Sequence, residues 1–169
     1  MTFKTNTSDG RTANNKNTKT QEKIEPCCVY IIDDDFDDRV LARKEIAQSE
    51  HVRNVEVFRD GKDLTDYLEE QGFMDRSVIL TTPILLIVDI EMPMKDGLEV
   101  IYELKSDPLL RDLPLVVLTG TENQAKFDKA KEMGANAVLR KPLTRGMIDK
   151  FYKDAWKWPP EALWGDYSK

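Results

Sequence analysis

Residues 84–89 read Ile-Leu-Leu-Ile-Val-Asp, a run of five apolar side chains that ends on a carboxylate. An unbroken apolar run of this kind is typical of a central strand in a parallel sheet, because such a strand is buried on both faces. Asp89 would then stand just beyond the carboxyl end of the strand, where open parallel sheets bind their ligands. The stretch therefore predicts both the middle of a fold and the place of a site.

Strand and helix patterns alternate on both sides of this run. We expect further strands at 28–32, 55–58, 115–118 and 137–139, and helices at about 36–48, 61–71, 97–105, 122–133 and 144–156. This alternation predicts an α/β fold with a parallel sheet and right-handed crossovers. Phe36, Val40 and Leu41 recur at helical spacing in the first helix, and Ile101 and Tyr102 should point inward from the third.

Composition bounds the class of protein. The chain has 169 residues and a net charge of −6, which fits one domain with tails. An acidic balance argues against a mainly electrostatic nucleic-acid binder. There is no apolar run of about 18 residues and no leader-like apolar segment, so we expect no membrane insertion. The two cysteines, Cys27 and Cys28, are adjacent and unsuited to a disulfide framework, which favours the reducing cytoplasm.

The ends of the chain differ from its middle. Residues 1–25 are rich in Thr, Asn and Lys, which predicts a disordered tail. Residues 26–156 form the expected domain, and residues 157–169 form a C-terminal tail. Its tryptophans favour a tail that folds back over its own domain, with docking on a partner as the alternative. These lengths leave no room for an effector domain, so we expect output through another protein.

Four predicted strand ends carry polar residues suited to phosphate chemistry. Asp33-Asp34-Asp35 follows the first strand, Asp89 the third, Thr119 ends the fourth and Lys141 follows the fifth. Gathered carboxylates tolerate one another around a hard cation such as Mg²⁺, which also accepts phosphate oxygens. A carboxylate is a competent nucleophile toward phosphorus, and Lys and Thr side chains suit phosphate oxygens. Taken singly, the aspartates fit a helix cap and Lys141 fits a solvated surface, but their joint order favours a phosphoacceptor site.

At these positions the sequence resembles the receiver domain of two-component response regulators, the family of the chemotaxis response regulator. The resemblance covers roughly residues 27–156. It rests on the first strand with its acidic residues (29–35), the strand and Met-Pro turn at 86–93, the strand at 116–120 and the Lys141-Pro142 turn. It implies a doubly wound, flavodoxin-like five-stranded parallel sheet with strand order 2-1-3-4-5.

The resemblance also implies a role for each site residue. Asp89 would accept a phosphoryl group, Asp34 would ligate Mg²⁺ and Asp33 would do so directly or through water. The backbone carbonyl of Glu91 would complete the protein's share of the metal shell, and Thr119 and Lys141 would bind phosphoryl oxygens. Asp35 is expected to cap the following helix, and the Lys141-Pro142 peptide is often cis in the family. Such a protein assists its own phosphotransfer and dephosphorylation but is not a turnover enzyme.

Two positions depart from the family pattern or modify it. The family often has an aromatic residue three places before the lysine, where this chain has Val138. The chain therefore lacks the ring that usually rotates together with a threonine shift, and we expect output through backbone or helix shifts. Glu91 lies two residues beyond the nucleophile, at a position that influences the lifetime of the acyl phosphate in the family.

Further segments, among them 58–61 and 105–108, resemble stand-alone regulators that work beside bacteriophytochromes. The implied partners are a sensor histidine kinase or a histidine phosphotransfer protein, and a downstream protein target. Some regulators of that group are dimers, so a homodimer is another expected assembly. His51, the only histidine, is expected to be a solvated loop residue.

Three other functions remain open at this stage. A phosphatase of the haloacid dehalogenase type also uses Asp, Thr, Lys and Mg²⁺, but its nucleophile follows the first strand. A flavodoxin-like cofactor binder would need a Ser-, Thr- or Gly-rich loop where this chain has Asp33–Asp35. A constitutive adaptor would keep the fold without the switch, and the complete acidic set argues against it.

Overall fold

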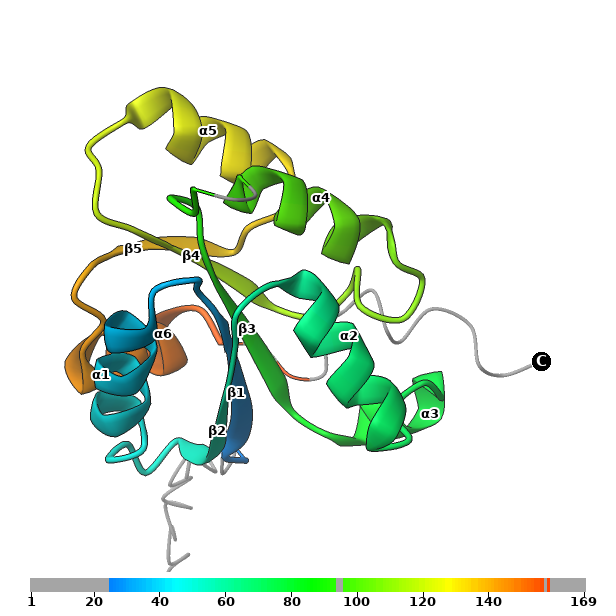
Figure 1. The fold of residues 1–169 in the computed structure, drawn as a ribbon. Helices are drawn as coiled ribbons and strands as arrows, with labels where there is room; N and C mark the ends of the chain where they lie inside the picture. Colours follow the sequence, from blue (N-terminus) through cyan, green and yellow to red (C-terminus); the bar gives the residue numbers. More distant parts are fainter. Residues whose placement is uncertain (1–24, 94–95, 157, 159–169) are drawn as a thin grey trace, which may run out of the picture.

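Five parallel strands form one sheet in the order β2-β1-β3-β4-β5. Figure 1 shows it in the computed structural model of the chain, which describes residues 25–93, 96–156 and 158. The fold class and strand order inferred from the sequence are confirmed. The strands are β1 (Cys27–Ile32), β2 (Val52–Phe58), β3 (Ile84–Asp89), β4 (Leu115–Thr119) and β5 (Ala137–Arg140).

Helices cover both faces of the sheet. On one face lie α1 (Phe36–Ile46) and α6 (Arg145–Asp154), and on the other lie α2 (Gly61–Glu70), α4 (Gly97–Ser106) and α5 (Gln124–Glu132) (Figure 1). The side chains of β3 alternate between two apolar cores, with Leu86 and Val88 facing α2 and α4 and Leu85 and Ile87 facing α1 and α6. This two-sided burial is the reason that residues 84–88 are apolar without interruption.

A sixth helix, α3 (Arg76–Thr81), was not predicted from the sequence. It has six residues, too few to give a clear helical period. Its signal was the cap at Asp75, whose side chain accepts a hydrogen bond from the Ser77 amide at 2.8 Å. Ile79 buries the helix against the core that also holds α2 and α4.

The apolar side chains that recur at helical spacing in α1 lie on its outer face. Phe36, Val40 and Leu41 share a period in α1, but they are 68%, 49% and 57% exposed. The buried face is instead the pair Ala42 and Ile46, four residues apart, which packs on the sheet. A sequence period locates a stripe but does not say which of two stripes meets the sheet.

Tyr102 of α4 was expected to point inward, and this prediction was wrong, because the side chain is 67% exposed. Val100, Ile101 and Leu104 fill the core-facing side of this helix. The predicted inward position of Ile101 is confirmed. A large aromatic side chain therefore stands on the outer surface of α4.

Aromatic rings stack in a column that includes Tyr152 of α6. His51 stacks on Tyr152, Tyr152 on Trp156 and Trp156 on Trp158, with ring centroids 4.9, 4.6 and 6.0 Å apart. His51 lies in a turn, as expected, but it is half-buried against an aromatic ring instead of solvated. Trp156 and Trp158 pack on their own domain, as predicted, whereas Trp164 lies outside the described residues.

Residues 1–24 of the expected disordered tail at 1–25, and nearly all of the C-terminal tail, also lie outside the described residues. In the ranges that the structure describes, no helix combines the length and apolar character needed to cross a membrane.

Candidate functional site

The end of β1 delivers three aspartates that have different surroundings. Asp33 is 1% exposed, and its Oδ1 accepts a hydrogen bond from the Asp35 amide at 2.9 Å. Asp34 is half-buried. Asp35 caps α1, because its side chain accepts hydrogen bonds from the amides of Asp37 and Asp38 at 2.8 and 3.0 Å. The expected role of Asp35 as the cap of α1 is confirmed.

Asp89 is the last residue of β3 and is 2% exposed. Its Oδ1 accepts a hydrogen bond from the Glu91 amide at 2.9 Å. Gly97, the first residue of α4, lies so close that a Cβ there would be 2.1 Å from the Asp89 carbonyl oxygen. Only glycine allows the start of α4 to approach the end of β3 in this way.

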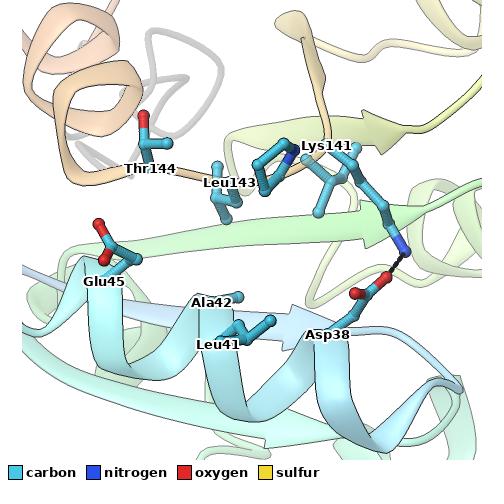
Figure 2. A pocket seen from close by; sticks show the side chains of 9 residues that line it. Asp38, Leu41, Ala42, Glu45, Lys141, Leu143 and Thr144 are labelled. Carbon is cyan, nitrogen blue, oxygen red and sulfur yellow. Dashed lines mark hydrogen bonds and ion pairs between the residues drawn. The ribbon is translucent and has the colours of Figure 1, made fainter.

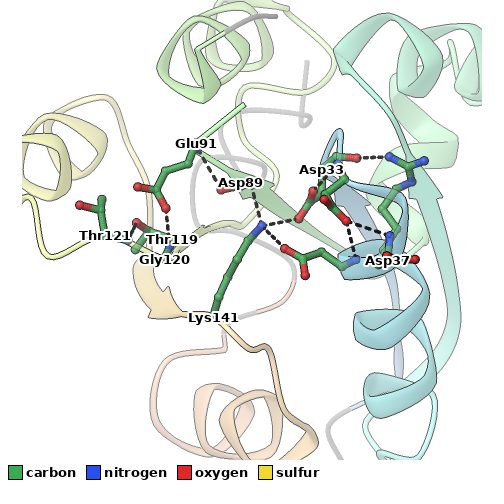
Figure 3. Close-up of polar contacts among 11 residues, drawn as sticks. Asp33, Asp37, Asp89, Glu91, Thr119, Gly120, Thr121 and Lys141 are labelled. Atoms are coloured by element: carbon green, nitrogen blue, oxygen red, sulfur yellow. Dashed lines mark hydrogen bonds and ion pairs between the residues drawn. The ribbon is translucent and has the colours of Figure 1, made fainter. Parts of the chain in front are cut away.

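Lys141 connects the ends of three elements. Its Nζ lies 2.6 Å from a carboxylate oxygen of Asp38, an ion pair drawn in Figure 2. The same Nζ lies 2.9 Å from Asp33 Oδ2 and 2.8 Å from Asp89 Oδ2, and Figure 3 shows it between the two. The Lys141-Pro142 peptide is cis, as the resemblance implied. One ammonium group thus links the ends of β1, β3 and β5 with the first turn of α1.

Thr119 ends β4 next to Asp89, since Leu118 pairs with Asp89 in the sheet. It is fully buried, and its hydroxyl accepts a hydrogen bond from the Thr121 amide at 3.1 Å. Its carbonyl accepts a hydrogen bond from the Lys141 amide at 2.8 Å. The following amide, that of Gly120, donates to Glu91 Oε2 at 2.6 Å (Figure 3).

Burial and charge oppose each other in this cluster. Burial opposes the charge on Lys141, but hydrogen bonds to Asp38, Asp89 and Asp33 outweigh it and raise the pKa of this ammonium. Burial raises the pKa of Asp33, and the bonds from Lys141 and from the Asp35 amide offset only part of that rise. The lysine is therefore charged, while burial still disfavours the charged form of Asp33.

The acidic residues also meet the distance requirement for a cation. Asp33, Asp34 and Asp89 each bring one carboxylate oxygen within 4.8 Å of the others. Within the described ranges, no other trio of His, Cys, Asp or Glu side chains gathers in this way. Hard oxygen donors of this kind suit Mg²⁺ or Mn²⁺ and not a soft metal. The residues present therefore fit a divalent cation.

Sequence reasoning missed Asp38 as a member of the site. It stands in the first turn of α1, three residues after the cap, and turns back toward Lys141. Helical spacing from Asp35 was the available signal, because residues three apart lie on one face of a helix. The contact between Glu91 and Gly120 was missed as well, since it joins two loops that are remote in sequence.

A cavity of about 310 Å³ opens beside Lys141, between α1 and the segment that leads into α6 (Figure 2). Its walls are mainly apolar and include Leu41, Ala42, Leu118 and Leu143. Asp38 and Lys141 stand at one end of it. The exposed apolar face of α1 therefore continues into a hollow that reaches the acidic site.

The comparisons with known proteins agree with this geometry. The response regulator receiver domain matches residues 29–153. Because that match spans most of the chain, the protein belongs to the response regulator receiver family. This assignment does not favour the phosphatase alternative.

Among the relatives is the response regulator Rcp1 of Synechocystis, which is 30% identical over 132 residues. That match covers 78% of this chain and 86% of Rcp1. The structure of the Mn(2+)-bound form of a response regulator Rcp1 superposes with a TM-score of 0.59 at 26% identity, over 79% of this chain and 99% of the other.

Two phytochrome-associated regulators are equally similar in structure. The phosphorylated cyanobacterial phytochrome response regulator RcpA has a TM-score of 0.61, and the bacteriophytochrome response regulator AtBRR has one of 0.60. Both are 26% identical over 79% of this chain, covering 99% and 96% of the respective structures. The expected resemblance to regulators of this group is confirmed.

The shared ammonium leads to a prediction for Lys141→Ala. The change leaves two buried carboxylates, Asp33 and Asp89, without their cation, and should lower the free energy of unfolding by about 3–5 kcal/mol. Lys150→Ala is the control, because Lys150 pairs with Asp154 on an exposed helix surface, where such pairs contribute about 0.5 kcal/mol or less. Urea denaturation without divalent cations measures both. Equal losses in the two variants would contradict this view of the site.

Proposed function

We propose that the protein is a two-component response regulator that accepts a phosphoryl group on Asp89 from a phosphohistidine of a partner. The observation that carries the proposal is the placement of Lys141 Nζ within 2.9 Å of both Asp33 and Asp89, with Asp34 beside them. A nucleophile, a fixed cation and a set of metal-binding carboxylates then lie together. Phosphoryl transfer requires mainly such positioning and charge neutralisation.

The transfer is a substitution at phosphorus. A carboxylate oxygen of Asp89 attacks the phosphorus, forming a P–O bond, while the P–N bond breaks and its electron pair stays on the donor imidazole. Lys141 and the Thr119 hydroxyl would hold the phosphoryl oxygens. In dephosphorylation, a water oxygen attacks the phosphorus and the P–O bond to Asp89 breaks, which returns the carboxylate and inorganic phosphate.

The same proposal assigns a Mg²⁺ site to Asp33, Asp34, Asp89 and the backbone carbonyl of Glu91. The ion would supply charge neutralisation for the carboxylates and for the incoming phosphoryl group. The residue-91 backbone is suited to this role because its amide already holds Asp89 Oδ1. The Mn(2+)-bound form of Rcp1 supports the proposal, because it shows that a relative binds a divalent cation.

Asp89→Asn should abolish labelling by a small phosphodonor such as phosphoramidate with Mg²⁺, because the amide is not a nucleophile toward phosphorus. Asp66→Asn changes an exposed aspartate on α2 and should leave labelling intact. Intact-protein mass spectrometry shows the gain of one phosphoryl group. Labelling of the Asp89→Asn protein at the wild-type rate would contradict the assignment of the nucleophile.

Asp34→Asn should remove most of the rise in Tm that Mg²⁺ gives to the wild-type protein. A ligand that binds only the folded state stabilises it by about 2.7 kcal/mol at 100 times its Kd, so the rise is measurable. Asp35→Asn is the matched control, because Asn caps a helix as well as Asp and Asp35 faces the α1 amides. A Mg²⁺ response that is lost in Asp35→Asn and kept in Asp34→Asn would refute the ligand set.

We further propose that the phosphodonor docks on the exposed face of α1 made by Phe36, Val40 and Leu41, hereafter the α1 apolar face. These side chains are 49–68% exposed, and Leu41 also lines the cavity that extends to Lys141. A donor histidine has to reach Asp89, which is 2% exposed, so its protein must cover the neighbouring surface. The occupant is a sensor histidine kinase or a histidine phosphotransfer protein.

Leu41→Asp should slow phosphotransfer from the kinase found by phosphotransfer profiling by at least about tenfold, the equivalent of 1.4 kcal/mol. Labelling by phosphoramidate should be unchanged, since a small donor needs no docking face. Tyr102→Asp is the control, an exposed aromatic changed on α4. If Leu41→Asp instead changed only self-association, the α1 apolar face would bind a second copy and this assignment would fail.

Two further parts of the proposal concern the cell. The phosphorylated domain signals through contacts with a downstream protein. The location is cytoplasmic, consistent with Cys27 and Cys28, which are both free thiols. Burial raises the pKa of Cys27 to about 12, so this thiol is an inert core side chain at neutral pH.

A further inference from the structure

The contact between Glu91 and Gly120 joins the two loops that border the site. Gly120 donates its amide hydrogen to Glu91 Oε2 at 2.6 Å, and a Cβ at Gly120 would lie 3.0 Å from the same oxygen. Figure 3 shows the Glu91 side chain extending away from Asp89 toward Gly120, at the end of β4. A charge-assisted bond of this length fixes the loop after β4 to the loop after β3.

The bonded amide belongs to the residue that directly follows the end of β4. Thr119, the preceding residue, ends β4 beside the end of β3, and the backbone of Glu91 holds Asp89 Oδ1 at 2.9 Å. A phosphoryl group on Asp89 would bring three anionic oxygens into this space. Lys141 and Thr119 can serve some of them, and the Gly120 amide is the next donor along the chain.

We propose that the Glu91 carboxylate is an internal substitute for a phosphoryl oxygen, which occupies the Gly120 amide until phosphorylation displaces it. We call this contact the Glu91 latch. The inference rests on the proposed function, because it assumes that the phosphoryl group arrives on Asp89. Glu91 is here a positioning residue: its side chain acts on the loop after β4 and not on the reacting atoms.

Repulsion between like charges explains why a phosphoryl group displaces the Glu91 carboxylate from the Gly120 amide. A phosphoryl group and the Glu91 carboxylate carry like charge, so they cannot share one amide donor. Both Glu91 and Gly120 are exposed, so the carboxylate can swing into water without disturbing the core. The latch therefore makes phosphoryl binding weaker than the site would otherwise allow, and it releases the loop after β4 when binding occurs.

This release supplies a switch that does not need an aromatic side chain in β5. Val138 is a half-buried residue that pairs with Val117 and packs against the core, and it has no ring to rotate. The latch instead connects occupancy of Asp89 to the start of α5 (Gln124–Glu132), a few residues beyond Gly120. The bistable element is the loop from 120 to 123, either held by Glu91 or held by the phosphoryl group.

A competing explanation assigns the same effect to charge alone, and two substitutions separate the two. Glu91→Asp keeps the charge but is one methylene too short to reach the Gly120 amide. Glu91→Gln keeps the reach but loses the charge. Glu122→Gln is the control, because Glu122 lies in the same loop and pairs with Arg140 at 2.6 Å instead of with Gly120.

The experiment measures two quantities in each protein. Hydrogen exchange of the Gly120 amide, followed by NMR without any phosphate analogue, reports the latch itself. Titration with beryllofluoride in the presence of Mg²⁺ reports binding at Asp89. We expect Glu91→Asp to speed exchange of this amide and to bind beryllofluoride about fivefold more tightly, an effect of the size expected for loss of one hydrogen-bonded competitor. Glu122→Gln should match the wild type in both.

The outcomes separate the two proposals. If Glu91→Asp binds beryllofluoride like the wild type and only Glu91→Gln binds it more tightly, charge alone explains the effect and the latch is overturned. Unchanged exchange of the Gly120 amide in Glu91→Asp also overturns it. If the wild type itself fails to bind beryllofluoride with Mg²⁺, the proposed function fails first and the latch fails with it.

Discussion

The ammonium of Lys141 is the group on which the arrangement of the site depends. It contacts carboxylates of Asp33, Asp38 and Asp89, which come from the end of β1, the first turn of α1 and the end of β3. Three acidic groups this close repel one another strongly where solvent is excluded. Lys141 directly follows β5, the edge strand beyond β4. Its side chain extends from there toward Asp89 and Asp33 (Figure 3). One cation thus holds the carboxyl edge of the sheet together.

The carboxylates at this edge of the sheet outnumber the positive charges that face them. One lysine faces three aspartates, with Asp34 close by, so the cluster retains net negative charge. A divalent cation would relieve the remaining repulsion, and the same cation would make an approaching phosphoryl group tolerable. The Glu91 latch adds a further anion at the border of the site, and it gives the protein a way to couple the charge at Asp89 to the loop before α5. Stability, metal binding and signalling would then be three consequences of one local charge arrangement.

The sequence predicted the sheet well because its strands are short apolar runs. It also predicted that the polar residues at the strand ends would gather, because parallel strands place their carboxyl ends at one edge. The sequence did not predict features that depend on tertiary packing. Phe36 and Leu41 of α1 form an apolar stripe, yet the smaller stripe of Ala42 and Ile46 meets the sheet. Helix α3 was too short to show a period. The contact between Glu91 and Gly120 spans 29 residues of sequence, so no local pattern reveals it.

The central claim is that Asp89 is the residue that receives the phosphoryl group, and reductive trapping tests it most directly. Borohydride reduces an aspartyl phosphate to homoserine, which is stable and can be located by peptide sequencing. After treatment with a phosphodonor and Mg²⁺, the account predicts homoserine at position 89 and at no other aspartate. Homoserine at Asp33 or Asp34, or its absence from a protein that has demonstrably gained a phosphoryl group, would contradict it.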